Sequence, residues 1–377
     1  MAPLQRLLSV LAVVAIASCL AAPVGSSPPG GGGSDGPSGD AAYIFSKPGP
    51  VGFVTHKDLS VEISQSTGCA VGRCRAAVTA TVPLLGTAAG MGLIETIPLV
   101  LLSPGFLVPR MQYIEYAERL ASWGFAVLLW EPTGERLWAA NTHKTLALMT
   151  YEVWAWALGR NRDPLSPLHE AFNETEGLLL VGHSRGAKAN CLASALFPGV
   201  VRGVVNLDPV DSSPFTQESA DYPSALPLLR FARAPMLSIG SQLGNESIAF
   251  GPSCAPNGAN WASFYEHSRV GWYIELLNAG HMQFLGGGSC LECPLLRSMC
   301  RKGSQSDAAV RGMSMTAMTA WLSTVTGRFR GINSYVVDWA LSLEARGLAV
   351  SGSKGVLQPD DGMLFAWPPA ESSVSAL

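Results

Sequence analysis

The chain has 377 residues, of which 48% are hydrophobic and 14% are charged, and its formal net charge at pH 7 is −3. A chain of this length and apolar content can bury a large core, and its few charges suit a protein that handles lipid-like ligands. The slightly negative charge and the lack of a basic cluster argue against a nucleic-acid partner.

The N-terminus has the composition of a targeting peptide. Residues 7–20 form an uncharged apolar run after Arg6, which is too short to span a membrane but typical of a signal-peptide core. We therefore expect residues 1–22 to be a signal or targeting peptide that is cleaved. Cys19 lies within this segment.

A single folded domain is expected after this leader. Residues 23–40 are almost wholly Gly, Ser, Pro and Ala, a composition typical of a flexible linker. The domain is expected over residues 41–350, and residues 351–377 are expected to form a polar tail.

Predicted strands and helices alternate from residue 97 onward. Residues 97–102 predict a buried strand that breaks at Pro104 and Gly105. Residues 111–124 space their apolar side chains as a helix does, and residues 125–131 predict the next strand. This order predicts an α/β fold in which a mostly parallel central sheet carries helices on both faces.

The sequence LLLVGHSRGAKANCLASAL places Ser184 between a predicted strand over 178–181 and a predicted helix over 187–196. Gly182 and Gly186 flank the serine and allow main chain to pass closely on either side. This pattern is typical of a nucleophile elbow, and Ser184 is the candidate nucleophile. The alternative, a turn serine without chemistry, is disfavoured by the strand and helix around it.

A carboxylate must orient the histidine that activates such a serine. Asp208 follows the predicted strand over 201–207, and the carboxyl ends of parallel strands are where such sheets bind ligands. Glu246 is an alternative acid, but it lies within the glycosylation sequon 245–247 and is expected at the surface. Asp211 is a second alternative, whose ordinary role would be to cap a turn. We predict Asp208 as the acid.

The base is chosen by chain order, because hydrolases of this architecture place serine, acid and histidine in that sequence. Only His267 and His281 follow Asp208. His267 lies at a predicted helix end, whereas His281 follows a predicted strand and a glycine, so His281 is the predicted base. His183, next to the nucleophile, is expected to be a packing residue.

An oxyanion formed on an ester carbonyl needs main-chain N–H donors. The residue after the nucleophile, Arg185, is expected to supply one. The loop after the strand over 97–102 is expected to supply the other, through Phe106, with Leu107 as the neighbouring possibility.

Several apolar residues near the candidate site are predicted to bind substrate, although each of them could equally be core. They are Leu107, Val108, Met282, Phe284 and Leu285, together with Phe106. Residues 285–307 are glycine-rich and irregular, which predicts a movable flap over the pocket.

Six cysteines in the expected mature domain can form disulfides, as an exported chain permits. Cys69 is expected to pair with Cys74. The pairing among Cys254, Cys290, Cys293 and Cys300 stays open, and zinc on these four is disfavoured. Cys191 is expected to be a buried free thiol.

Four motifs together resemble the chlorophyllases. They are GHSRGAK at Ser184, LDPVD at Asp208, SCAPNGANW around Cys254 and GHMQFL at His281. The resemblance extends from the strand near residue 97 to a helix near Met315. It implies an α/β hydrolase with Ser184, Asp208 and His281 as its triad, which cleaves the phytyl ester of chlorophyll to chlorophyllide and phytol without a metal or other cofactor.

Two positions depart from the family pattern. Ala187 stands where the family has a second glycine, and Pro104 stands where the family has histidine. Neither change removes a main-chain donor, so activity is expected, but the substrate preference is open.

We therefore predict a serine carboxylic ester hydrolase, and specifically a chlorophyllase. The alternatives are a lipase or carboxylesterase of broad specificity and a non-catalytic hydrolase fold that binds hydrophobic ligands. The expected partner is chlorophyll or another lipophilic ester, with peripheral association with pigment-bearing membranes. The expected location is the chloroplast, reached through an N-terminal signal or a bipartite targeting peptide, and the alternative is secretion. Sequons at Asn173 and Asn245 agree with passage through an endomembrane system.

Overall fold

The computed structural model describes residues 44–84, 96–136, 139–214, 216–248, 251–287, 290, 293–327 and 332–354. The predicted leader, the predicted linker and most of the predicted tail lie outside the described residues.

The described residues form one nine-stranded sheet with the order β1-β2-β4-β3-β5-β6-β7-β8-β9. The strands are β1 (Phe53–Glu62), β2 (Arg75–Pro83), β3 (Leu99–Ser103), β4 (Ala126–Pro132), β5 (Leu178–His183), β6 (Val201–Leu207), β7 (Met236–Ser241), β8 (Gly271–Leu276) and β9 (Ala349–Lys354). From β4 to β8 all neighbouring strands are parallel, while β1, β2 and β9 pair antiparallel at the two edges. The predicted mostly parallel sheet is confirmed.

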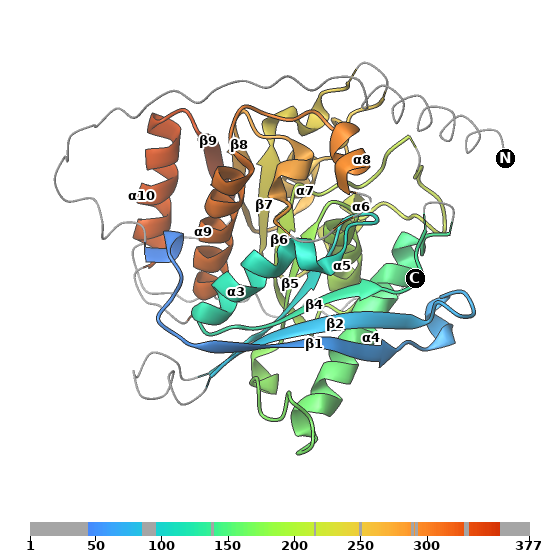
Figure 1. Ribbon diagram of the computed structural model, residues 1–377. Helices are drawn as coiled ribbons and strands as arrows, with labels where there is room; N and C mark the ends of the chain where they lie inside the picture. Colours follow the sequence, from blue (N-terminus) through green and yellow to red (C-terminus); the bar gives the residue numbers. More distant parts are fainter. Residues whose placement is uncertain are drawn as a thin grey trace, which may run out of the picture.

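Helices cover both faces of this sheet (Figure 1). They are α3 (Ile114–Ser122), α4 (His143–Arg162), α5 (Arg185–Leu196), α6 (Leu226–Leu229), α7 (Trp261–His267), α8 (Cys293–Ser298), α9 (Asp307–Val325) and α10 (Ile332–Ala345). The short 3-10 helices are η2 (Gln65–Thr67), η3 (Arg110–Tyr113), η4 (Glu174–Glu176), η5 (Gln242–Asn245) and η6 (His281–Phe284). Among the described helices, none is long and apolar enough to cross a membrane.

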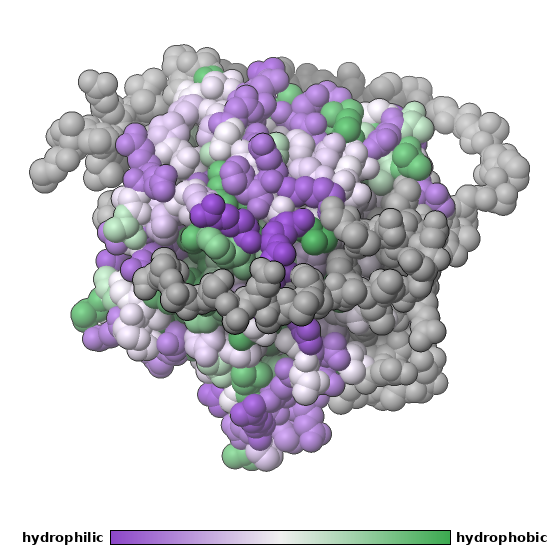
Figure 2. Space-filling view, turned by 180° about the vertical axis from the view of Figure 1, so that it is seen from behind, coloured by the Kyte–Doolittle hydropathy of each residue, from purple (hydrophilic) through white to green (hydrophobic). Residues whose placement is uncertain are grey.

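Alternating side chains of the central strands divide the core into two layers. On β3, Val100 and Leu102 face a cluster that includes α3, α9 and α10, whereas Leu99 and Leu101 face a cluster that includes α4 and α5. These strands are apolar on both faces because helices cover both faces. On the coloured part of the surface in Figure 2, hydrophobic residues lie in small groups among hydrophilic ones.

Three disulfides connect six of the seven described cysteines. Cys69 pairs with Cys74, as predicted. Cys254 pairs with Cys300, and Cys290 pairs with Cys293, which decides the pairing that the sequence left open. Cys191 is a buried free thiol, as expected.

Candidate active site

Ser184 lies at the sharp junction between β5 and α5, with φ +53° and ψ −121°. A non-glycine residue with positive φ is strained, which is a feature of functional turns. Gly186 allows the turn to form, because a β-carbon at this position would overlap the main-chain oxygens of Ser103 and Pro104. Gly182 serves the same purpose on the strand side, where a β-carbon would lie 2.6 Å from the amide nitrogen of Ala187.

The structure brings Ser184, His281 and Asp208 together at the carboxyl ends of the strands. The Oγ atom of Ser184 lies 3.0 Å from Nε2 of His281, and Nδ1 of His281 lies 2.7 Å from Oδ2 of Asp208. Because a carboxylate only accepts, Nδ1 of His281 carries the proton and Nε2 is left to accept from the serine hydroxyl. This is the tautomer that a serine nucleophile requires.

Asp208 is completely buried, and its carboxylate accepts three hydrogen bonds. Besides His281, it accepts from the main-chain N–H of Ser241 at 2.9 Å and from the Ser241 hydroxyl at 2.6 Å. Ser241 ends the neighbouring strand β7, so the sheet itself places these donors. Glu246, by contrast, is exposed, and its carboxylate lies 3.6 Å from the guanidinium of Arg301.

Asp211, the second alternative acid, belongs to a separate buried cluster. It accepts from the main-chain N–H of Ala225 and the hydroxyl of Ser224, both at 2.7 Å. Lys188 of α5 is fully buried, donates to the main-chain oxygen of Asp211, and lies 3.8 Å from its carboxylate. Burial lowers the pKa of Lys188, which the nearby Asp211 carboxylate partly offsets. The pair fastens the loop after Asp208 to the elbow helix.

The side chain of Arg185 joins the elbow to the loop after β4. Its guanidinium donates to both carboxylate oxygens of Glu135, at 3.2 and 2.6 Å, and lies 5.1 Å from the centre of the Phe106 ring. Glu135 also accepts from the main-chain N–H of Asn141 at 2.8 Å. The residue after the candidate nucleophile is therefore fixed in place, next to the predicted oxyanion loop.

The predicted oxyanion loop has an unusual main-chain conformation. The amide of Gly105 is already used, because it donates to the hydroxyl of Tyr113 at 3.1 Å. Leu107 has φ +55°, and Phe106 and Leu107 are both half-buried. The next amides in the loop are those of Phe106 and Leu107, the two predicted donors.

The other predicted substrate-binding residues lie in the core. Phe284 and Leu285 have no exposed surface, and Val108 and Met282 are less than a tenth exposed. All four belong to the cluster that α3, α9 and α10 cover. In this conformation only Phe106 and Leu107 of the predicted set offer apolar surface to a ligand.

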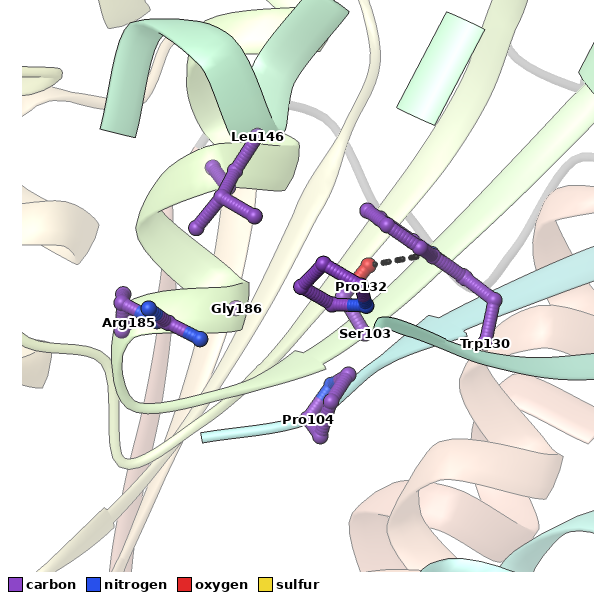
Figure 3. Close-up of a pocket in the computed structure, with 8 residues that line it drawn as sticks. Ser103, Pro104, Trp130, Pro132, Leu146, Arg185 and Gly186 are labelled. Atoms are coloured by element: carbon purple, nitrogen blue, oxygen red, sulfur yellow. Dashed lines mark hydrogen bonds between the residues drawn. The ribbon is translucent and has the colours of Figure 1, made fainter. Parts of the chain in front are cut away.

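A small pocket lies behind the elbow, on the side of α4 (Figure 3). It is lined by Ser103, Pro104, Trp130, Pro132, Leu146, Arg185, Gly186 and Ala189. Trp130 donates to the hydroxyl of Ser103 at 2.9 Å, and that hydroxyl donates to the Asn190 side chain at 2.8 Å. These bonds hold β3, β4 and α5 together beneath the nucleophile.

The described part of the predicted flap is tied down. Gln283 accepts with Oε1 from the main-chain N–H groups of Gly280 and Gly303, and donates with Nε2 to Gln305 and Asp307. The disulfide from Cys300 to Cys254 adds a covalent link. Residues 288–289 and 291–292 lie outside the described residues.

Sequence reasoning missed several residues around the triad. Lys188 carries a sequence signal, since it is a charge inside an otherwise small and apolar helix. The others have partners that lie far away in the chain, such as Asp208 for Ser241 and His183 for Tyr113, and these pairings leave no sequence signal. They are Ser241, Glu135, Tyr113 and Gln283. Within the described residues, no group of His, Cys, Asp or Glu is arranged to hold a metal ion.

The comparisons with known proteins agree with the motifs and the fold. A protein-family model described as Chlorophyllase matches residues 64–337, which is more than half of the chain. A search of curated proteins found no match. The matched range contains the elbow, Asp208 and the His281 element, and the resemblance predicted from the motifs is confirmed. The chain therefore belongs to the chlorophyllase family and has the α/β-hydrolase fold.

Proposed function

We propose that this protein is a serine carboxylic ester hydrolase that cleaves the phytyl ester of chlorophyll to chlorophyllide and phytol. The observation that carries the proposal is the continuous hydrogen-bonded chain from Ser184 through His281 to Asp208. The family match supports the choice of substrate.

In the first step, the Oγ atom of Ser184 attacks the ester carbonyl carbon while Nε2 of His281 takes the hydroxyl proton. The buried Asp208 carboxylate stabilises the imidazolium that forms. The main-chain N–H groups of Arg185 and Phe106 donate to the developing oxyanion. The C–O bond to phytol then breaks, and His281 returns the proton to the leaving alkoxide.

In the second step, water hydrolyses the acyl-enzyme. His281 accepts a proton from the water as its oxygen attacks the acyl carbon, and then protonates Ser184 as the acyl bond breaks. The products are the chlorophyllide carboxylic acid and the free enzyme. The two steps use three side chains, two main-chain N–H groups and one water molecule.

Burial supports one direction of substrate approach. Asp208 and His281 are buried, whereas Ser184 is half-buried, so the reacting carbonyl meets the triad at its serine end. Phe106 and Leu107 stand on the oxyanion side with apolar surface partly exposed. These side chains suit an isoprenoid alcohol or a tetrapyrrole face.

The test is chromatographic detection of chlorophyllide after incubation with chlorophyll. Ser184→Ala should lower turnover by at least about 10³-fold, because it removes the nucleophile. Ser194→Ala, which changes a buried serine in the helix that follows Ser184, is the control and should retain activity. Full turnover by Ser184→Ala would overturn the proposal.

The alternative functions give different results with the unmodified protein. A broad lipase or carboxylesterase would hydrolyse p-nitrophenyl esters and triglycerides faster than chlorophyll. A binding protein without activity would hydrolyse none of these, and a fluorophosphonate probe, which needs an activated serine, would not label it.

A further inference from the structure

A chain of hydrogen bonds behind the triad connects the predicted oxyanion loop to the main chain of His281. The N–H of Gly105 lies 3.1 Å from the Tyr113 hydroxyl, and that hydroxyl lies 2.8 Å from Nδ1 of His183. Nε2 of His183 lies 3.1 Å from the main-chain oxygen of His281. His183 therefore does more than fill space, which was its predicted role.

The chemistry of the groups fixes the direction of every bond. A carbonyl oxygen only accepts, so Nε2 of His183 carries the proton and donates to His281. Nδ1 of a neutral His183 must then accept from the Tyr113 hydroxyl, whose oxygen accepts from Gly105. The donors all point the same way, from the oxyanion loop to His281.

The network depends on a neutral His183. A protonated ring would donate from both nitrogens, and Tyr113 could no longer donate to it. His183 is 1% exposed and Tyr113 is completely buried. Burial, with the nearby His281 ring, lowers the pKa of His183 well below its usual range, so the neutral form is kept.

The main chain of the predicted oxyanion loop passes close to this network and has an unusual conformation. A β-carbon at Gly105 would lie 2.9 Å from Nδ1 of His183 and 3.4 Å from the Tyr113 hydroxyl, so the loop approaches closely because residue 105 is glycine. Leu107, two residues later, has φ +55°, a conformation that persists only where surrounding contacts hold it.

We propose that Tyr113 and His183 are positioning residues that hold the oxyanion loop and the catalytic histidine at a fixed separation. This inference rests on the proposed function, since it assigns the two residues to the same hydrolytic site. The oxyanion donors and the general base must meet one tetrahedral carbon together, and small errors in their separation lower the rate strongly. The rings of His183 and His281 lie 4.8 Å apart, so a shift of one reaches the other directly.

The first experiment compares two buried tyrosines with a soluble p-nitrophenyl ester. Tyr113→Phe should lower kcat at least tenfold and leave KM within twofold, because it disconnects Gly105 from His183 without touching the substrate. Tyr116→Phe is the matched control. Tyr116 is equally buried, and its ring lies 6.3 Å from that of Tyr113, but its hydroxyl donates at 2.9 Å to the main-chain oxygen of Phe284 and is not a member of the chain of hydrogen bonds. Its kcat should stay within twofold of the unmodified protein.

The second experiment tests whether kcat depends on the hydrogen-bond donor and acceptor of the His183 side chain. His183→Gln keeps one donor and one acceptor and should retain at least five times the kcat of His183→Leu, which keeps neither. The double variant Tyr113→Phe with His183→Leu should lose no more than the worse single variant, because both belong to one chain of bonds. Gly105→Ala, which removes no polar group, should also lower kcat by displacing the His183 ring.

The results separate this inference from the proposed function. An unmodified protein that neither hydrolyses esters nor reacts with a fluorophosphonate would overturn the proposed function. An active unmodified protein in which Tyr113→Phe and Tyr116→Phe have equal kcat would overturn only the positioning role. So would equal activity of the His183→Gln and His183→Leu variants, or additive losses in the double variant.

Discussion

At the scale of single residues, much of the main-chain strain lies at the candidate site. Of the six described non-glycine residues with positive φ, Asp58 lies in β1 and Glu170 lies between α4 and η4. The other four lie in the predicted oxyanion loop, the elbow, the turn at the candidate acid and the approach to His281, and they are Leu107 (+55°), Ser184 (+53°), Asp208 (+41°) and Asn278 (+53°). Each costs on the order of 1 kcal/mol relative to an ordinary conformation. The contacts around the site, such as those of Asp208 with Ser241, must hold these conformations.

The identity of the acid is testable at the same scale. Asp208→Asn should lower kcat for a p-nitrophenyl ester by about 10³- to 10⁴-fold, as loss of the carboxylate does in serine proteases, because the amide neither fixes the tautomer of His281 nor stabilises its charge. Steady-state kinetics give the change.

Glu246→Gln is the control for this prediction. Its exposed carboxylate lies 3.6 Å from Arg301, and Nδ1 of His281 contacts Asp208 instead, so kcat should stay within twofold. The opposite result, in which Glu246→Gln is inactive and Asp208→Asn is active, would move the acid to the loop after β7.

At the scale of elements, the candidate site is assembled from strand ends and stabilised by links between loops. The disulfide between Cys254 and Cys300 spans 46 residues of sequence, and His281 lies within the loop it closes. The disulfide between Cys290 and Cys293 spans 3 residues. Loop-closure entropy predicts that the longer crosslink contributes more to the free energy of unfolding than the shorter one.

Replacing Cys254 and Cys300 together by alanine should lower the free energy of unfolding by about 4 kcal/mol in this chain-entropy model. Replacing Cys290 and Cys293 should lower it by only about 2 kcal/mol. Urea denaturation of both double variants without reductant measures the difference. Equal losses would show that entropy of the unfolded chain does not explain the role of the longer link.

At the scale of the whole molecule, two buried histidines make stability depend on pH. His143 is 4% exposed, and burial, together with the charges of Lys188 and Arg185, lowers its pKa to about 2. The pKa of His183 is also lowered well below its usual value. Both rings stay neutral in the folded protein while the unfolded chain takes up protons near pH 6.5.

Stability should therefore fall as the pH drops below about 6.5, because the unfolded state then binds more protons than the folded state. Each histidine should lower the free energy of unfolding by about 2 kcal/mol when the pH falls from 7 to 5. Urea denaturation at the two pH values measures the total.

His143→Phe isolates one of these contributions. Phenylalanine can keep the edge contact with the Tyr222 ring, which lies 4.9 Å away, but it cannot titrate. Its fall in stability between pH 7 and pH 5 should be smaller than that of the unmodified protein by about 2 kcal/mol. If the variant and the unmodified protein lose the same stability between pH 7 and pH 5, then His143 has the same pKa in the folded and unfolded states.

The sequence alone was enough for the fold class, the elbow, the order of Ser184, Asp208 and His281, and the pairing of Cys69 with Cys74. These features depend on apolar periodicity, glycine positions and chain order, which are local or read along the chain. The burial of Phe284 and Leu285 was not predictable, because an apolar residue near a site has the same sequence pattern whether it meets ligand or core.

The tertiary structure alone decided the partners of distant polar groups. The bond between Tyr113 and His183 joins residues 70 positions apart, and the two bonds from Ser241 to Asp208 join residues 33 apart. Such contacts depend on which strands become neighbours and on which face each side chain lies, so periodicity along the chain does not determine them. The same reason left the pairing among Cys254, Cys290, Cys293 and Cys300 open until the loops were placed in space.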